Sequence, residues 1–177
     1  IEEQTSIYIN LAYTYQLMGK YIKAENLFTE LVTINEAKNN IHEMAQGNIW
    51  LALLNNNQQK YLKAKAYGLK ALSQFRALGV ASYAVAIQKN LGISYWGLGN
   101  YDEARKYYRE GLEIYFDNPH KHLDGALSIM AWVIYLMHSE GNTALGVEVA
   151  EHVITHPSTN HENREVADRI YATLRAE

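Results

Sequence analysis

The sequence predicts an all-α protein, built as a right-handed α-solenoid of four helical hairpins with a C-terminal capping helix. Two observations predict this fold class. Apolar residues recur at three- and four-residue spacing through nearly the whole chain, and no alternating strand pattern competes with them. The same pattern also returns every 40 residues, a period typical of stacked helical hairpins rather than of one globular core.

Four positions carry the repeat in the first three units: a small residue, a residue three later that is aromatic in the first and third units, a further aromatic residue, and an alanine three after that. In the first three units these positions hold Ala12, Tyr15, Tyr21 and Ala24, then Ala52, Asn55, Tyr61 and Ala64, then Gly92, Tyr95, Tyr101 and Ala104. Small residues let two helices cross closely, and aromatic side chains fill the space beside the crossing. We therefore expect each unit to be one hairpin of two helices.

The apolar periodicity predicts helices at about residues 4–18, 21–37, 41–57, 61–77, 81–98, 101–116, 121–139, 143–155 and 160–175. Gly19, Gly99 and Gly141 each follow the first helix of a pair, where a left-handed C-cap suits glycine. In the second unit the run 55–59 (Asn-Asn-Asn-Gln-Gln) takes this place, and asparagine tolerates the same backbone better than most residues.

These elements predict one domain, residues 1–177, with repeats at about 4–40, 41–80, 81–120 and 121–157 and a capping helix at about 159–175. The fourth unit is offset by 42 residues instead of 40, because its Gly141 turn aligns with Gly99. Thr159 and Glu162 have the spacing of a capping box for the last helix. Since the chain starts at Ile1 with a helical stripe close behind, we expect it to be a piece of a longer protein.

These signature residues resemble the tetratricopeptide repeat. The matching residues are Ala12, Tyr15, Gly19, Tyr21 and Ala24 in the first unit, and Gly92, Tyr95, Gly99, Tyr101 and Ala104 in the third. The second unit matches without its glycine, and the fourth is weak because Thr143 replaces the aromatic residue. The resemblance covers nearly the whole chain and implies a superhelix whose concave face binds a partner.

The usual repeat of this family has about 34 residues. The longer units here resemble the arrays at the C-terminal end of bacterial multidomain signalling ATPases and transcription regulators, where they act as sensor, lock or assembly arm. That resemblance implies a bacterial protein with a protein or peptide as its partner. We expect a cytoplasmic setting, because the sequence shows no basic-then-apolar leader and no membrane helix. The parent's own switch domain, a second copy and a small ligand are further options. No Gly-x-x-x-x-Gly-Lys phosphate-binding string occurs in this sequence.

In the tetratricopeptide family the first helices line the concave face. In this register the resemblance places on that face Tyr13, Gln16, Trp50, Leu53, Asn56, Lys89, Asn90, Ile93, Trp96, Trp132, Tyr135 and His138. Tyrosine and tryptophan beside amide groups suit a peptide, an amphipathic helix or a sugar-like ligand. Any one of these aromatic residues has an alternative interpretation as packing between neighbouring units.

We expect no enzymatic activity, no cofactor and no metal site. The chain has no cysteine, which excludes disulfides, thiolate metal sites and cysteine catalysis. His152 and His156 are four residues apart, but Val153 stands where a zinc-dependent protease carries glutamate. No serine lies in a nucleophile-elbow motif, and no apolar run approaches the ~18 residues of a membrane helix.

Charge is distributed unevenly along the chain. Segment 44–101 contains no acidic residue and six cations, which are Lys60, Lys63, Lys65, Lys70, Arg76 and Lys89. Six charges over such a length are typical of a solvated helix face, so nucleic-acid contact through this segment is only a minor alternative. The main functional hypothesis is a non-catalytic interaction or ligand-sensing module, the regulatory arm of a larger signalling protein. The alternative is a structural module that self-associates or locks onto its parent.

Overall fold

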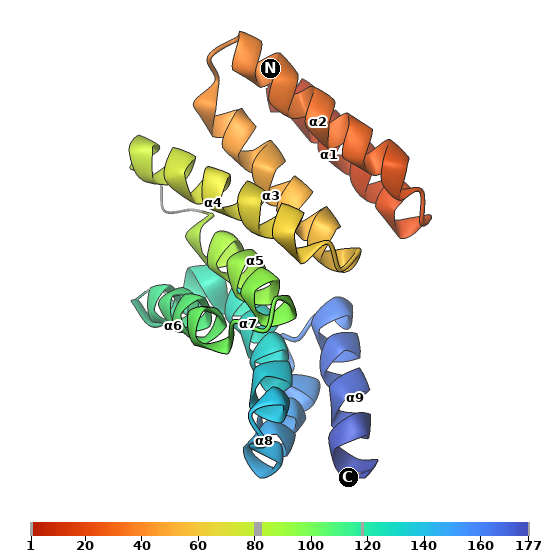
Figure 1. The fold of residues 1–177 in the computed structure, drawn as a ribbon, viewed down its shortest axis with the longest axis vertical. Helices are drawn as coiled ribbons and strands as arrows, with labels where there is room; N and C mark the ends of the chain where they lie inside the picture. The colour runs from red at the N-terminus through yellow and green to blue at the C-terminus, as the bar shows by residue number, and fades with distance from the viewer. Residues whose placement is uncertain (1, 80–82, 118, 177) are drawn as a thin grey trace.

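The structure is a computed structural model that describes residues 2–79, 83–117 and 119–176. Within those ranges the chain is entirely helical apart from its turns and forms an all-α solenoid, as predicted (Figure 1). In chain order the helices are α1 (Glu2–Leu17), α2 (Tyr21–Ala37), α3 (Ile41–Asn57), α4 (Tyr61–Leu78), α5 (Ala84–Gly97), α6 (Tyr101–Asp117), α7 (Pro119–Ser139), α8 (Thr143–Thr155) and α9 (His161–Ala176). Their ends agree with the predicted boundaries to within about three residues.

The turns between paired helices are held by left-handed residues, as glycine at these positions predicts. Gly19, Gly99 and Gly141 have φ angles of 70°, 74° and 76°. In the second unit the left-handed residue is Gln59, with φ 58°, and not one of the asparagines before it. Its place 40 residues after Gly19 fixes the conformation, so the turn geometry overrides the preference of the residue.

The predicted cap of the last helix was wrong. α9 begins at His161, and the side-chain oxygen Oδ1 of Asn160 accepts a hydrogen bond from the N–H of Asn163 at 2.8 Å. Asn160 is therefore the N-cap. The hydroxyl of Thr159 instead donates to the carbonyl oxygen of Val153 at 2.6 Å and ties the loop to the end of α8.

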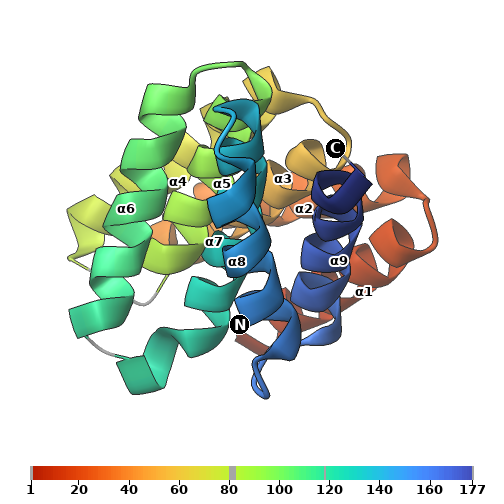
Figure 2. The same cartoon turned by 90° about the horizontal axis from the view of Figure 1, so that it is seen from below.

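The array is bent, with the first helices of the pairs on its inner side. α1 contacts α3, α3 contacts α5, α5 contacts α7, and α7 contacts α9. In the described part of the chain, the second helices α2, α4, α6 and α8 contact only the helices directly before and after them in the chain. Because the first helices touch and the second helices do not, the stack curves as it runs from α1 and α2 at one end to α9 at the other (Figure 1). Figure 2 shows the same helices from below, along the length of the stack.

Small residues at the helix crossings allow this close stacking. Every alanine of the repeat signature in the first three units is fully buried, namely Ala12, Ala24, Ala52, Ala64 and Ala104. In the third unit Gly92 lies directly against the ring of Tyr108, which is buried on α6. The second signature aromatic residue is less buried: Tyr21 is 40% exposed and Tyr101 is 37% exposed, while Tyr61 packs over Gly97 of the next unit.

Replacing Gly92 by alanine tests this crossing. A Cβ at this position would overlap the Tyr108 ring atoms, so Gly92→Ala should lower the free energy of unfolding by about 1–3 kcal/mol. Urea unfolding measures the change. Tyr108→Leu provides the control, because it removes the ring that the added Cβ would meet. The double variant should therefore lose clearly less stability than the sum of the losses of the two single variants. An unchanged urea midpoint for Gly92→Ala would show that α5 and α6 are not in close contact there.

Candidate partner-binding face

The candidate site is the side of the array on which the first helices meet, called the inner face below. Its predicted residues fall into two groups. Those with side-chain surface left half-buried or exposed are Tyr13, Trp50, Leu53, Lys89, Trp96, Trp132, Tyr135 and His138. Those that are buried are Gln16, Asn56, Asn90 and Ile93. Only the first group has side-chain surface to offer a partner.

Three of the surface residues form one aromatic cluster across α5 and α7, made of Trp96, Trp132 and Tyr135. The ring centroids of Trp96 lie 5.9 Å from Trp132 and 5.5 Å from Tyr135, and Trp132 lies 5.2 Å from Tyr135. Tilted and edge-on contacts at these distances are favourable for aromatic rings. Because each ring remains only half-buried, the cluster presents a joined aromatic surface from two helices.

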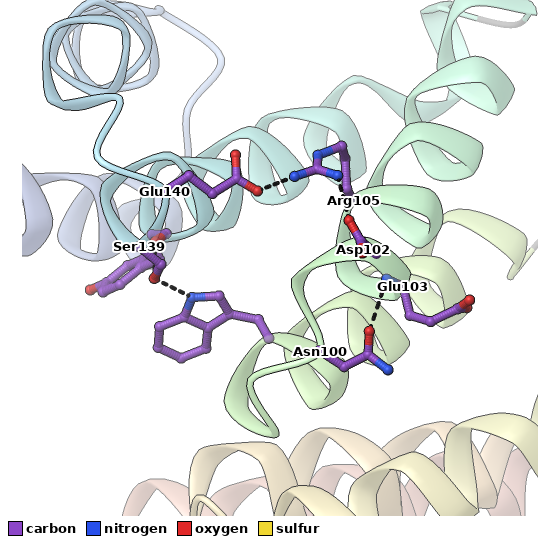
Figure 3. A network of polar contacts seen from close by, with 8 residues as sticks. Asn100, Asp102, Glu103, Arg105, Ser139 and Glu140 are labelled. Carbon is purple, nitrogen blue, oxygen red and sulfur yellow. Dashed lines mark hydrogen bonds and ion pairs between the residues drawn. The ribbon is translucent and has the colours of Figure 1, made fainter.

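Polar contacts at the ends of α5 and α7 hold this cluster in place (Figure 3). The indole nitrogen of Trp96 donates a hydrogen bond to the Ser139 hydroxyl at 3.1 Å. That hydroxyl in turn donates to the carbonyl oxygen of Tyr135 at 2.8 Å. Next to it, Arg105 of α6 pairs with Asp102 at 2.9 Å and with Glu140, the residue after α7. These contacts join the turns of the third and fourth units and restrict the Trp96 side chain.

A second aromatic contact lies at the other end of the inner face. Tyr13 of α1 meets Trp50 of α3 edge-on, with ring centroids 6.2 Å apart. The other partner of Trp50 is Phe28, a fully buried residue of α2 whose ring is stacked on it at 5.8 Å and 5°. Trp50 is therefore partly a core residue, and Tyr13 is the more exposed member of the pair.

The buried amides between α3 and α5 form a satisfied network instead of a surface. The amide nitrogen of Asn56 donates to the carbonyl oxygen of Asn90 at 2.9 Å, and the Ser94 hydroxyl donates to the Asn56 side-chain oxygen at 2.9 Å. The Asn90 amide donates back to the carbonyl oxygen of Ala86. Buried polar groups with partners like these stabilise one arrangement of the helices. Asn56 and Asn90 thus fix the joint between the second and third units.

Lys89 is a cation held at the contact between α5 and α7. Its ammonium donates to the Ser128 hydroxyl at 3.1 Å. Burial lowers the pKa of Lys89, while the carboxylates of Glu162 and Asp124 act in the opposite direction and favour its charged form. Asp124 also accepts a hydrogen bond from the Asn160 amide at 2.7 Å, which ties α7 to the start of α9. A cation kept near a binding surface against a desolvation cost is a candidate functional residue.

Two residues of this region had no signal in the sequence. Arg105 and Glu140 also line an open surface pocket of about 460 Å³, together with Leu98, Asn100 and Asp102. They lie 35 residues apart and look like ordinary charged positions near helix ends. No pattern in the neighbouring sequence predicts that Arg105 and Glu140 form an ion pair. The one indirect signal is the 42-residue offset of the fourth unit, which aligns Glu140 with Leu98 at the end of the first helix of the third unit.

The described residues provide neither a metal-binding cluster nor a membrane-spanning helix. Among the described residues, no group of three or more His, Asp or Glu side chains is placed to hold a metal ion, although the His152 and His156 rings lie 5.6 Å apart. Of the helices described, none is long and apolar enough to span a lipid bilayer. Within the basic segment, Lys63 lies 3.7 Å from Glu25 and Lys65 lies over the ring of Tyr95.

The lowered pKa of Lys89 predicts how stability responds to its removal. At pH values between the pKa of Lys89 in the folded protein and its pKa of 10.5 in the unfolded chain, the unfolded chain binds more protons than the folded protein, so stability rises with pH. The charged Lys89 therefore destabilises the fold most at pH values below its pKa in the folded protein, and this effect disappears as the pH approaches 10.5. Lys89→Met should therefore raise the free energy of unfolding at pH 7, and the gain should shrink at pH 10. Urea unfolding at both pH values measures it, with the exposed Lys70→Met as control. A loss of stability at pH 7, or an equal gain at both pH values, would contradict this assignment.

Comparison with known protein families gives matches in two stretches of the chain. Models described as tetratricopeptide repeat match residues 43–115 and residues 10–34, which together are more than half of the 177 residues. Comparison with curated proteins gives no match. The matched stretches contain the signature positions of the first three units.

Solved structures share the fold at low sequence identity. BtubC (BKLC) from P. vanneervenii has a TM-score of 0.70 and 19% identity, covering 98% of this chain and 79% of that one. A putative kinesin light chain with TPR-like repeats from Podosopora anserina has a TM-score of 0.71 and 18% identity, covering 98% and 86%. A Rap protein complexed with Competence and Sporulation Factor has a TM-score of 0.72 and 16% identity, covering 98% and 54%. These structures show that the solenoid fold is shared, and the two family-model matches, together with the repeat signature, show that the chain belongs to the tetratricopeptide repeat family.

Proposed function

We propose that this chain is a non-catalytic interaction module whose inner face binds a polypeptide segment, either extended or as an amphipathic helix. Solenoids of this family provide an interaction surface through their curvature. On the inner face the surface is made of aromatic rings, and tryptophan and tyrosine are the residues that most often dominate binding energy at protein interfaces. Their large area and few rotatable bonds make them efficient contacts.

The observation that carries this proposal is the aromatic cluster of Trp96, Trp132 and Tyr135. Its rings come from two different helices, yet they join into one half-buried surface. The bond from Trp96 to Ser139 restricts its rotation before any ligand arrives, which lowers the entropy cost of binding. All three tryptophans of the chain lie on first helices, the helices that form the inner face.

Lys89 supports the same proposal by adding a polar anchor. A lysine ammonium has three N–H donors, and one of them is directed at Ser128. The others can meet backbone or carboxylate oxygens of a bound segment. Because Asp124 and Glu162 lie close enough to influence Lys89, a strongly acidic segment would be repelled, so we expect a mainly apolar segment with few negative charges.

The wider role follows from the resemblance of the long repeats. We propose that the module is a regulatory arm of a larger bacterial signalling protein in the cytoplasm. The Rap protein, of similar fold, is described as a complex with a competence and sporulation factor, which is in keeping with a role of this kind. We do not propose nucleic-acid binding, because Lys63, Lys65 and Lys89 each have a partner within the protein.

Peptide selection tests the proposed inner face directly. A library of random 15-residue peptides on phage would be selected against the whole chain, and the enriched peptides measured by fluorescence anisotropy. Trp132→Ala should weaken their binding more than tenfold, because truncating an aromatic residue at an interface centre costs about 2 kcal/mol or more.

The matched control is Phe116→Ala, which removes a largely exposed aromatic ring from α6, a second helix. This variant should bind the selected peptides as tightly as the parent. The proposal fails if no peptide is enriched, or if Phe116→Ala weakens binding as much as Trp132→Ala does. Urea unfolding of both variants would show that any loss of binding is not a loss of the fold.

A further inference from the structure

One face of α1 is apolar but uncovered. Ile7 and Leu11 lie one helical turn apart and are 59% and 43% exposed, and Thr14 continues the same face and is exposed too. Scattered exposed apolar residues are normal on protein surfaces. A stripe at positions i, i+4 and i+7 of one helix is different, because it is the pattern by which a helix packs against a neighbour.

The repeat itself shows what covers these positions elsewhere. Forty residues on from Leu11, Leu51 is 1% exposed, and eighty residues on from Ile7 and Leu11, Ile87 and Leu91 are 1% and 0% exposed. In the third unit the covering helix is α4, the second helix of the preceding pair. The stripe of α5 has the same chemistry as that of α1: isoleucine, leucine, then a small hydroxyl residue, which is Ser94 on α5.

The covering helix has a matching shape. Gly68 of α4 lies against Leu91, since a Cβ on Gly68 would stand 2.8 Å from the Leu91 methyl carbon Cδ2. Ala71, one turn later on α4, belongs to the same buried cluster as Ile87. In the fourth unit Gly111 of α6 lies against Ile129, the counterpart of Ile87. In the third and fourth units, small residues on the preceding second helix therefore accommodate large residues of the stripe. In the second unit the sizes are reversed, because Gly47, the counterpart of Ile7, lies against Val32 of α2.

We propose that the Ile7–Leu11–Thr14 face of α1 docks an amphipathic helix of the α4 type, with glycine opposite Leu11 and alanine or glycine opposite Ile7. This interaction surface is separate from the inner face and does not depend on the function proposed for it. A second copy of the chain is a poorer occupant. The small residues of its α4 and α6 are not available, because they already contact the next helix of the same chain. If two copies paired through their α1 stripes, isoleucine and leucine would meet with no small residue between them.

A labelled peptide of residues 61–78, the sequence of α4, is the probe for this surface. Its fluorescence anisotropy would be measured against the whole chain. We expect saturable binding that is at least tenfold weaker for Leu11→Asp and for a peptide carrying Gly68→Leu. The matched control is Ile22→Asp, an apolar residue at the start of α2 that is 77% exposed and outside the stripe; it should leave binding unchanged.

A covalent version removes the cost of folding a short isolated helix. In this variant a copy of residues 41–80 is joined directly before Ile1, which places the added Gly68 at the same sequence distance from Leu11 as the native Gly68 has from Leu91. The fusion should raise the urea midpoint of the chain, and Gly68→Leu in the added copy should abolish the gain. A gain in the fusion alone also supports the proposal.

Three outcomes overturn it. The first is neither peptide binding nor a higher urea midpoint of the fusion. The second is equal binding by Leu11→Asp and the parent chain, which would mean non-specific adhesion. The third is a dimer in sedimentation that Leu11→Asp dissociates, which would make a second copy the occupant of this face. Loss of peptide binding on the inner face, by contrast, would leave this surface unaffected.

Discussion

The contact between neighbouring first helices is the constraint on which the rest of the structure depends. Along the described part of the chain, α1, α3, α5, α7 and α9 each contact the next, while the second helices do not contact one another, so the array curves around the first helices. Such close stacking of helices requires small residues where the two helices of a hairpin cross. Ala12, Ala52 and Gly92 meet that requirement, and the ring of Tyr108 fills the space that Gly92 leaves. Curvature in turn brings side chains of separate units to one face.

The inner face combines two different tasks. The network of Asn56, Asn90 and Ser94 is buried and satisfied, and it specifies how the second unit joins the third. The aromatic cluster and Lys89 remain partly accessible, although burial of the Lys89 charge opposes folding. A surface with large aromatic groups and a partly desolvated cation is more costly to maintain than a plain polar face, which is typical of sites that bind.

Most of the fold was predictable because each local signal agreed with the repeat. The left-handed Gly19, Gly99 and Gly141 marked the turns, and the apolar spacing fixed the helices. Prediction failed where neighbouring residues offered equal chemistry. Thr159 and Asn160 are both good N-caps, and only the bond from Thr159 to Val153 decides between them.

The site was less predictable than the fold, for a related reason. An asparagine on a first helix can face a partner or the next helix, and only the contact between Asn56 and Asn90, 34 residues apart, shows which. The bond from Trp96 to Ser139 spans 43 residues and leaves no mark on local periodicity. The aromatic residues were predicted from their position in the repeat and not from their neighbours in the chain, and their role in binding stays a prediction.

Nuclear magnetic resonance of the indole N–H groups gives the most direct test of the central claim, that polypeptide binding occurs on the face where the first helices meet. A selected peptide titrated into the labelled chain should shift the indole signals of Trp96 and Trp132, while the backbone signals of α2 and α4 on the outer side stay in place. Unchanged indole signals, with shifts concentrated on the second helices, would contradict the account.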